Sequence, residues 1–279
     1  MRVGVIGGGR MGAGIAQVFL GIGAEVVLVE AGADAAAAAG DRVRSGLVKA
    51  AERGSLTEPV AVAAGRLRVV EDITELPPDA DLVVEAVPER PALKIDVLTR
   101  AEQALDNAAV LATNTSSLSI DELATALRRP DRFVGMHFFN PVPPSALVEV
   151  VLGVATGDDV RDRVVEWVTA LGKTGVVVRD SPGFASSRLG VLLGLEAARM
   201  VEEGVAEPEA IDKAMELGYR HPMGPLRLTD LVGLDVRLAI AEYLHEKLGD
   251  RFAPPDLLRR KVAAGELGRK TGQGFYSWS

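Results

Sequence analysis

Residues 3–12 of the chain read VGVIGGGRMG. The first four residues predict a short buried strand, and the residues after the glycines predict a helix. Gly7, Gly9 and Gly12 form the pattern G-x-G-x-x-G, which is weak alone but informative between a strand and a helix. In that setting Gly7 permits a tight turn, Gly9 leaves room above the backbone, and Gly12 lets the helix pack on the strand. The stretch therefore predicts the start of a doubly wound α/β domain.

An acidic residue completes this pattern. Residues 25–30 (EVVLVE) predict a second strand that ends at Glu30, 23 residues after Gly7 and close to the usual spacing of about 20. A carboxylate there can accept hydrogen bonds from both ribose hydroxyls of a dinucleotide, and it repels a 2′-phosphate. The helix N-terminus, with Arg10 and Met11, favours the pyrophosphate. We therefore predict NAD as the cofactor, against the alternative of a glycine turn beside a surface Glu.

Short apolar segments alternate with helical ones through the first half of the chain, which indicates a parallel sheet covered on both faces. Further predicted strands span residues 66–70, 81–86, 109–113, 133–139, 147–152 and 174–179. Predicted helices in this part span residues 11–20, 35–53, 93–105, 120–127 and 158–171.

A boundary is predicted at residues 180–183 (DSPG), with Pro182 early in the next helix. The remaining chain shows helical patterns near residues 208–217, 226–248 and 255–264, and an apolar stripe of Leu189, Leu192, Leu193 and Ala197. We therefore predict a Rossmann-like dinucleotide-binding domain over residues 1–180, followed by an all-α C-terminal domain over residues 181–279.

The composition argues against a metal site, a nucleic-acid partner and a membrane span. The 279 residues include no cysteine and three histidines, none of them spaced i,i+4, so no metal site is expected. The net charge is −8 without a basic stripe, which makes nucleic acid a poor partner. No run of 18 apolar residues predicts a membrane span, and the N-terminus does not resemble a signal peptide. We expect a cytoplasmic protein.

His137, within GMHFFNP (135–141), is the candidate general base. Glu149 lies in the apolar run LVEVV (147–151), where a carboxylate is costly without a partner. A carboxylate beside a histidine fixes its tautomer and stabilises the imidazolium. The sequence leaves open whether the two touch, and a buried structural histidine is the alternative. His221 and His245 are expected to be structural.

Several segments carry a resemblance to a known family. They are VGVIGGGRMGAGIAQ (3–17), NTSSLSI (114–120), HFFNPVP (137–143) with LVEVV (147–151), DSPGF (180–184), HPMGPLRLTDLVGLD (221–235) and GRKTGQGFY (268–276). Through them essentially the whole chain resembles the L-3-hydroxyacyl-CoA dehydrogenases. The resemblance implies a Rossmann-like NAD domain and a helical domain that mediates homodimerisation and closes over the substrate.

The resemblance also implies roles for individual residues. It makes His137 the catalytic base, Glu149 its orienting partner and Ser116 the residue that holds the substrate oxygen. It places further cofactor contacts at Ala86, Glu89, Lys94, Ser116 and Asn140. Lys49 matches a position linked to the CoA moiety, although a solvated helix lysine explains it as well. The implied reaction, in fatty acid metabolism and β-oxidation, is the reversible NAD-dependent oxidation of an (S)-3-hydroxyacyl-CoA, such as 3-hydroxybutyryl-CoA, to the 3-ketoacyl-CoA.

One position departs from the family pattern. Ser187 stands where a substrate-side Asn is usual, and a hydroxyl has a shorter reach and fewer donors than an amide. A same-family dehydrogenase for a free hydroxy acid or sugar acid therefore stays open, as does a dinucleotide-binding protein without activity. The unrelated 3-hydroxyacid dehydrogenases use a lysine of the helical domain, and no lysine lies in residues 182–188 or the helix after them.

Overall fold

The computed structural model describes residues 1–278, and the chain divides into two compact units, Met1–Asp180 and Ser181–Ser279. Each unit has a hydrophobic core of its own. We refer to them as the sheet unit and the helical unit.

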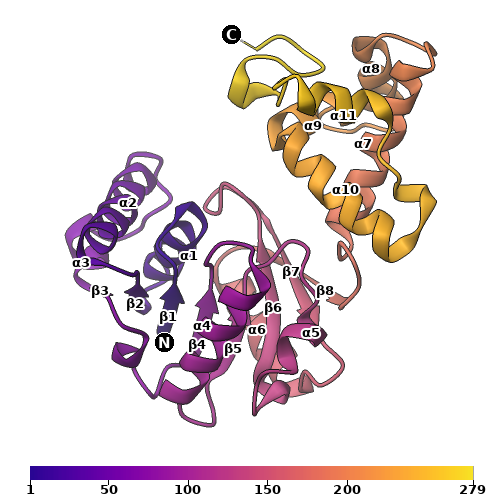
Figure 1. Cartoon of the computed structure of the whole chain (residues 1–279). Helices are drawn as coiled ribbons and strands as arrows, with labels where there is room; N and C mark the ends of the chain where they lie inside the picture. Colours follow the sequence, from indigo (N-terminus) through magenta and orange to yellow (C-terminus); the bar gives the residue numbers. More distant parts are fainter. Residues whose placement is uncertain (279) are drawn as a thin grey trace. The chain divides into compact units, whose positions relative to one another are not determined.

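The sheet unit is built on one eight-stranded sheet in the order β3-β2-β1-β4-β5-β6-β7-β8 (Figure 1). Its strands are β1 (Arg2–Ile6), β2 (Glu25–Val29), β3 (Leu67–Val70), β4 (Leu82–Glu85), β5 (Val110–Thr113), β6 (Phe133–Phe138), β7 (Leu147–Leu152) and β8 (Thr174–Arg179). The strands from β3 to β6 in this order pair in parallel, β7 pairs antiparallel with β6, and β8 pairs parallel with β7. The strand order reverses between β1 and β4, and ligands of doubly wound folds bind at such a point.

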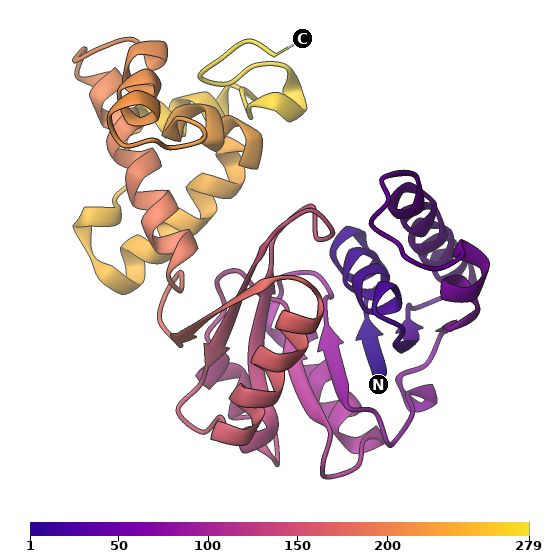
Figure 2. The ribbon, with the colours of Figure 1, turned by 180° about the vertical axis from the view of Figure 1, so that it is seen from behind.

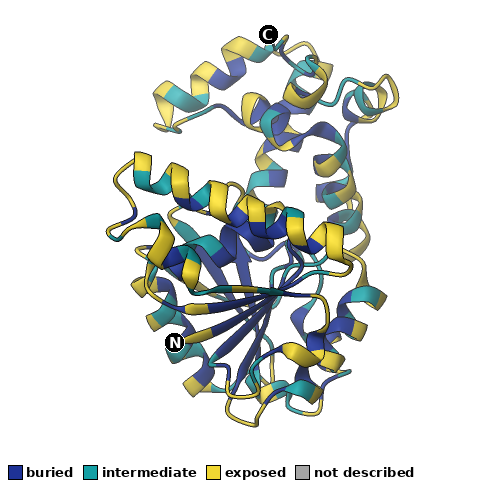
Figure 3. Ribbon diagram, turned by 90° about the vertical axis from the view of Figure 1, so that its left-hand side faces the viewer, coloured by how far each residue is buried: buried dark blue, intermediate teal, exposed yellow. Residues whose placement is uncertain are grey.

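Helices cover both faces of this sheet. They are α1 (Arg10–Gly21), α2 (Ala33–Glu52), α3 (Val60–Gly65), α4 (Pro91–Ala104), α5 (Ile120–Ala124) and α6 (Asp158–Ala170). Helices α4 and α5 lie in front of the sheet in Figure 1, and α6 lies in front of it in Figure 2. The residues of α1, α2 and α6 that face the sheet share one core with alternate strand residues such as Val5, Leu28 and Val150. Figure 3 shows the buried strands and the exposed outer faces of the helices.

The predicted fold class is confirmed, and every predicted strand is present to within one residue at either end. Strands β1, β4 and β5 are almost continuously apolar because both of their faces are covered. Helix α3 was not predicted, since its six residues VAVAAG are too few to show a helical period.

The helical unit contains five α-helices among the residues that the structure describes. They are α7 (Ser186–Glu202), α8 (Pro208–Gly218), α9 (Pro225–Val232), α10 (Leu234–Leu248) and α11 (Asp256–Ala263). The single helix predicted near residues 226–248 is wrong, because Gly233 has φ +105° and separates α9 from α10.

One further expectation for this unit is wrong. Pro182 lies before α7 rather than in its first turn, because Gly183 and Phe184 have positive φ and delay the helix. The apolar stripe does lie in a helix, α7, as its spacing predicts. Leu189 is 62% exposed and Leu193 is 42% exposed, whereas Val191, Leu195 and Ala198 face the core.

Two buried carboxylates fix the end of the chain in the helical unit. Asp230 accepts hydrogen bonds from the backbone N–H of Phe275 and Tyr276, each at 2.9 Å, and from Nε1 of Trp278 at 2.8 Å. Asp212 accepts one from the Tyr276 hydroxyl at 2.8 Å, and burial raises the pKa of that hydroxyl. The terminal segment is therefore anchored by charge-assisted hydrogen bonds rather than by regular secondary structure.

No helix of residues 1–278 is both long and apolar enough to span a membrane.

Candidate active site

The glycine turn has the shape that the sequence predicts. Gly7 has φ +99°, and a Cβ atom on it would lie 2.8 Å from the carbonyl oxygen of Ala86. A Cβ on Gly12 would lie 1.8 Å from the Gly7 carbonyl oxygen, whereas one on Gly9 would meet nothing within 4 Å. Strand and helix therefore need glycine at the first and last positions, and the open space above Gly9 fits a phosphate group at the start of α1.

Glu30 lies directly after β2 and faces this turn. Its Oε2 accepts a hydrogen bond from the Gly8 N–H at 2.6 Å, and its Oε1 accepts one from the Ala31 N–H at 3.0 Å. On the other side of Gly8, the Arg42 guanidinium of α2 donates to the carbonyl oxygen at 2.9 Å. The carboxylate is thus held at the edge of the turn, where the fold places the adenosine ribose. Arg10 and Met11 are the first two residues of α1.

His137 and Glu149 face each other across neighbouring strands. They are partners in the antiparallel register of β6 and β7, and Nδ1 of His137 lies 2.8 Å from Oε2 of Glu149. Both side chains are buried, and the imidazole also packs against the Phe139 ring, with 4.3 Å between centroids. The structure therefore brings together the two residues whose contact the sequence left open.

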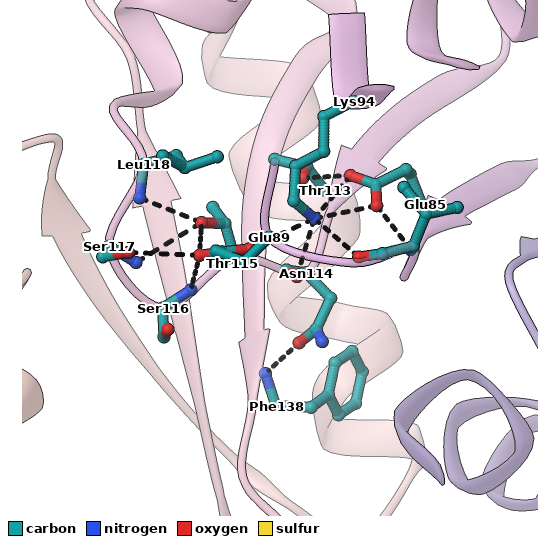
Figure 4. Close-up of polar contacts among 11 residues, drawn as sticks. Glu85, Glu89, Lys94, Thr113, Asn114, Thr115, Ser116, Ser117, Leu118 and Phe138 are labelled. Atoms are coloured by element: carbon teal, nitrogen blue, oxygen red, sulfur yellow. Dashed lines mark hydrogen bonds and ion pairs between the residues drawn. The ribbon is translucent and has the colours of Figure 1, made fainter. Parts of the chain in front are cut away.

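Three more predicted site residues lie in the loops after β4 and β5, and Lys94 lies in α4; Figure 4 shows Glu89, Ser116 and Lys94. Ala86 follows β4, and its N–H donates to the Ile6 carbonyl at 2.7 Å. The Glu89 carboxylate accepts hydrogen bonds from the Ser116 N–H at 3.0 Å and from the Ser117 hydroxyl at 3.2 Å. Lys94 is fully buried, and its Nζ lies 2.8 Å from Oε1 of Glu85.

Asn140 is exposed and begins a proline-rich loop that lies against α1 and α2. A groove of about 610 Å³ runs between this loop and the two helices, and its charged lining consists of Arg10, Arg42 and Lys49 with one carboxylate, Asp41. An adjoining groove of about 410 Å³ is lined by Lys49 and Arg53. Lys49 therefore belongs to a basic groove of the sheet unit.

The other predicted residues lie in the helical unit. Ser187 is the second residue of α7. His221 follows α8, and Nδ1 of His245, in α10, lies 3.8 Å from a carboxylate oxygen of Asp250. Residues 1–278 contain no cluster of His, Asp or Glu side chains placed to hold a metal ion.

Three polar residues near the site had no predicted role, Arg42, Glu85 and Thr113, whereas Asn114 belongs to the segment 114–120 that carries the family resemblance. Glu85 carries the same signal as Glu149, a carboxylate beside a strongly apolar run, LVV at 82–84. The other two carry no comparable signal, because their partners are brought close only by the sheet.

A glycine turn at the switch point and an acid after the second strand are the features of a dinucleotide-binding protein of the doubly wound class. The chain belongs to the 3-hydroxyacyl-CoA dehydrogenase family. Its residues 2–181 match the family's NAD-binding domain, and residues 183–278 match its C-terminal domain. The cofactor is NAD, as predicted.

Individual relatives are similar over the full length. A probable 3-hydroxybutyryl-CoA dehydrogenase of Deinococcus radiodurans is 46% identical over 279 residues, which is all of both chains. The crystal structure of M. tuberculosis FadB2 is 43% identical with a TM-score of 0.93, over 100% of this chain and 99% of that one. The (S)-3-hydroxybutyryl-CoA dehydrogenase PaaH1 of Ralstonia eutropha is 41% identical with a TM-score of 0.94, at the same coverage.

Proposed function

We propose that this enzyme catalyses the reversible oxidation of an (S)-3-hydroxyacyl-CoA, such as 3-hydroxybutyryl-CoA, to the 3-ketoacyl-CoA. The observation that carries the proposal is the buried contact of 2.8 Å between His137 and Glu149 at the same edge of the sheet as the glycine turn. Relatives similar over their whole length carry the name of this activity, which supports the choice of substrate class.

In the proposed mechanism His137 removes the proton of the 3-hydroxyl group. Its Nδ1 is engaged by Glu149, so the proton goes to Nε2. The carboxylate stabilises the imidazolium that forms and holds the ring in one tautomer. Ser116, held by Glu89 through its N–H, binds the substrate oxygen.

Bound NAD supplies the acceptor for the hydride that leaves C3. Glu30 and the turn at residues 7–12 hold the cofactor, with further contacts from Ala86, Glu89, Lys94 and Asn140.

The basic groove supports an acyl-CoA rather than a small free acid. Arg10, Arg42 and Lys49 line a space of about 610 Å³ on the sheet unit, and cations of this kind suit the phosphates of CoA. As the resemblance implies, we also propose that the helical unit mediates homodimerisation and closes over the substrate. A cytoplasmic location completes the proposal.

A free hydroxy acid or sugar acid is the second candidate substrate. The observation that favours it is Ser187 at the start of α7, where the family pattern has Asn. The serine hydroxyl has a shorter reach than the asparagine amide, so a substrate would receive a different hydrogen bond there.

The test is reduction of acetoacetyl-CoA, followed as loss of NADH absorbance, beside a panel of free 3-keto and sugar acids. We expect turnover of acetoacetyl-CoA with NADH, and at least tenfold lower kcat/KM with NADPH because Glu30 repels the 2′-phosphate. Turnover of a free acid without turnover of acetoacetyl-CoA would establish the second candidate. A preference for NADPH would refute the role of Glu30.

A further inference from the structure

Glu85 and Lys94 form a fully buried ion pair at the carboxyl end of β4. Both side chains have no exposed surface, and Nζ of Lys94 lies 2.8 Å and 3.0 Å from the two carboxylate oxygens of Glu85. Burial raises the pKa of Glu85 even though Lys94 opposes that change. A pair of apolar side chains of similar size would commonly be as stable here or more stable, so stability alone does not explain the charges.

The charges orient the backbone at the ends of two strands. Besides Glu85, Nζ of Lys94 lies 3.4 Å from the carbonyl oxygen of Val87 and 3.3 Å from that of Asn114. Glu85 in turn accepts hydrogen bonds from the Val87 N–H and the Thr113 hydroxyl, both at 2.6 Å. The pair therefore joins the loop after β4 to the loop after β5, as Figure 4 shows.

Both loops lead directly to the reacting groups. The Asn114 side chain accepts a hydrogen bond from the Phe138 N–H at 2.9 Å, next to His137 on β6. A carboxylate oxygen of Glu89 lies 3.4 Å from Nζ of Lys94, and the other oxygen accepts the Ser116 N–H at 3.0 Å. Lys94 is thus linked to the backbone of β6, beside the proposed base His137, through Asn114. It is linked to the backbone of the proposed oxygen-binding residue Ser116 through Glu89.

We propose that Glu85 is a positioning residue: through Lys94 it sets the backbone of residues 114–116 and of β6, and so aligns Ser116 with His137. An apolar pair at these positions would fill the space and keep the fold, but it would leave the carbonyls of Val87 and Asn114 without their donor. This inference rests on the proposed function for the roles of Ser116 and His137.

Glu102 of helix α4 is also a buried carboxylate, and its substitution provides the control. Glu102 is 3% exposed and accepts the backbone N–H of Arg128 at 3.0 Å and of Arg129 at 2.8 Å. It lies near the opposite end of α4 from Lys94, and its hydrogen bonds reach no residue of the candidate site. A loss of stability without a loss of alignment is therefore expected from Glu102→Gln.

The test compares three proteins: wild type, the double variant Glu85→Met with Lys94→Met, and Glu102→Gln. The double variant avoids a lone buried lysine, but the Val87 N–H and the Thr113 hydroxyl lose their acceptor. We therefore expect a folded protein with a lower melting temperature than wild type. We expect its kcat for acetoacetyl-CoA to fall at least tenfold, while KM for acetoacetyl-CoA changes less than threefold. The isotope effect with C4-deuterated NADH should rise, because misalignment slows hydride transfer. Glu102→Gln should melt earlier with kcat within twofold of wild type.

Amide hydrogen exchange gives a readout that is independent of substrate. We expect faster exchange at residues 87–89 and 114–117 in the double variant, and wild-type exchange there in Glu102→Gln. Wild-type exchange and kcat in a folded double variant would overturn the inference, as would an equal loss of kcat in Glu102→Gln. If wild type itself fails to reduce acetoacetyl-CoA, the proposed function is wrong. The exchange rates alone then test whether Glu85 and Lys94 hold the backbone of the two loops.

Discussion

The candidate site and the helical unit differ in how they partner buried carboxylates. At the candidate site, Glu85 faces Lys94 and Glu149 faces His137, so both carboxylates have a titratable side chain as their partner. In the helical unit, Asp230 is buried as deeply but bonds to backbone N–H groups and an indole. The first arrangement can hold or move a proton at a chosen point, whereas the second one anchors a segment of chain.

Arg237 of α10 fits neither arrangement. It is 8% exposed, and its Nε has no hydrogen-bond partner within residues 1–278. Burial alone lowers the pKa of this guanidinium to about 10. Glu85 and Glu149 thus lie at the candidate site, Asp230 fixes a segment of chain, and Arg237 does neither. Four substitutions test these differences.

The largest effect is expected from His137→Gln. Loss of the general base should lower kcat about 10²–10⁴-fold, with the Kd for NADH within threefold of wild type because the glycine turn is untouched. Turnover and NADH fluorescence measure the two quantities. His245→Gln, in the helical unit, is the control and should leave both unchanged. Near-normal turnover of the His137 variant would show that the buried His137–Glu149 pair is not the general base.

Asp230→Asn should act on stability instead. The amide offers one acceptor oxygen where three N–H groups need partners, so we expect a loss of about 2–3 kcal/mol and a melting temperature lower by about 5–10 °C. NADH affinity should stay the same. Asp250→Asn, an exposed carboxylate of the same unit, should melt within about 2 °C of wild type. An equal shift in the two variants would show that the buried anchor contributes nothing.

Arg237→Met should raise the melting temperature. The lowered pKa of about 10 means that the folded state disfavours the charge at neutral pH. Removing the charge should therefore stabilise the protein by about 1–3 kcal/mol, after allowance for lost packing. Arg269→Met, at an exposed position, is the control. A lower melting temperature for Arg237→Met would mean that the guanidinium finds an acceptor in solution.

The smallest effect is expected at the basic groove. Lys49→Met should raise KM for acetoacetyl-CoA about three- to tenfold with kcat within twofold, because an exposed cation contributes about 1 kcal/mol. Added salt should shrink the difference, since exposed charges are screened. Lys213→Met, an exposed lysine of the helical unit, should leave KM unchanged. No change for Lys49→Met would exclude this groove as the CoA site.

Much of the sheet unit could be predicted because its signals are local. A parallel strand buried on both faces is apolar throughout, so segments such as LVVE at 82–85 stand out from their neighbours. Gly7, Gly12 and Glu30 were found by spacing, because a strand, a turn and a helix of standard length impose it. The helical unit was harder, since the break at Gly233 lies within a pattern that continues on both sides.

The strands of the sheet unit, the glycine turn and the candidate residues could be predicted from the sequence, since these depend on neighbours close in the chain. Which of the candidate residues touch one another depends on the fold. The antiparallel pairing of β6 with β7 puts His137 opposite Glu149, and the ends of β4 and β5 surround Lys94 with acceptors. These contacts could not be predicted because the partners lie on segments that are far apart in sequence and meet only in the folded sheet.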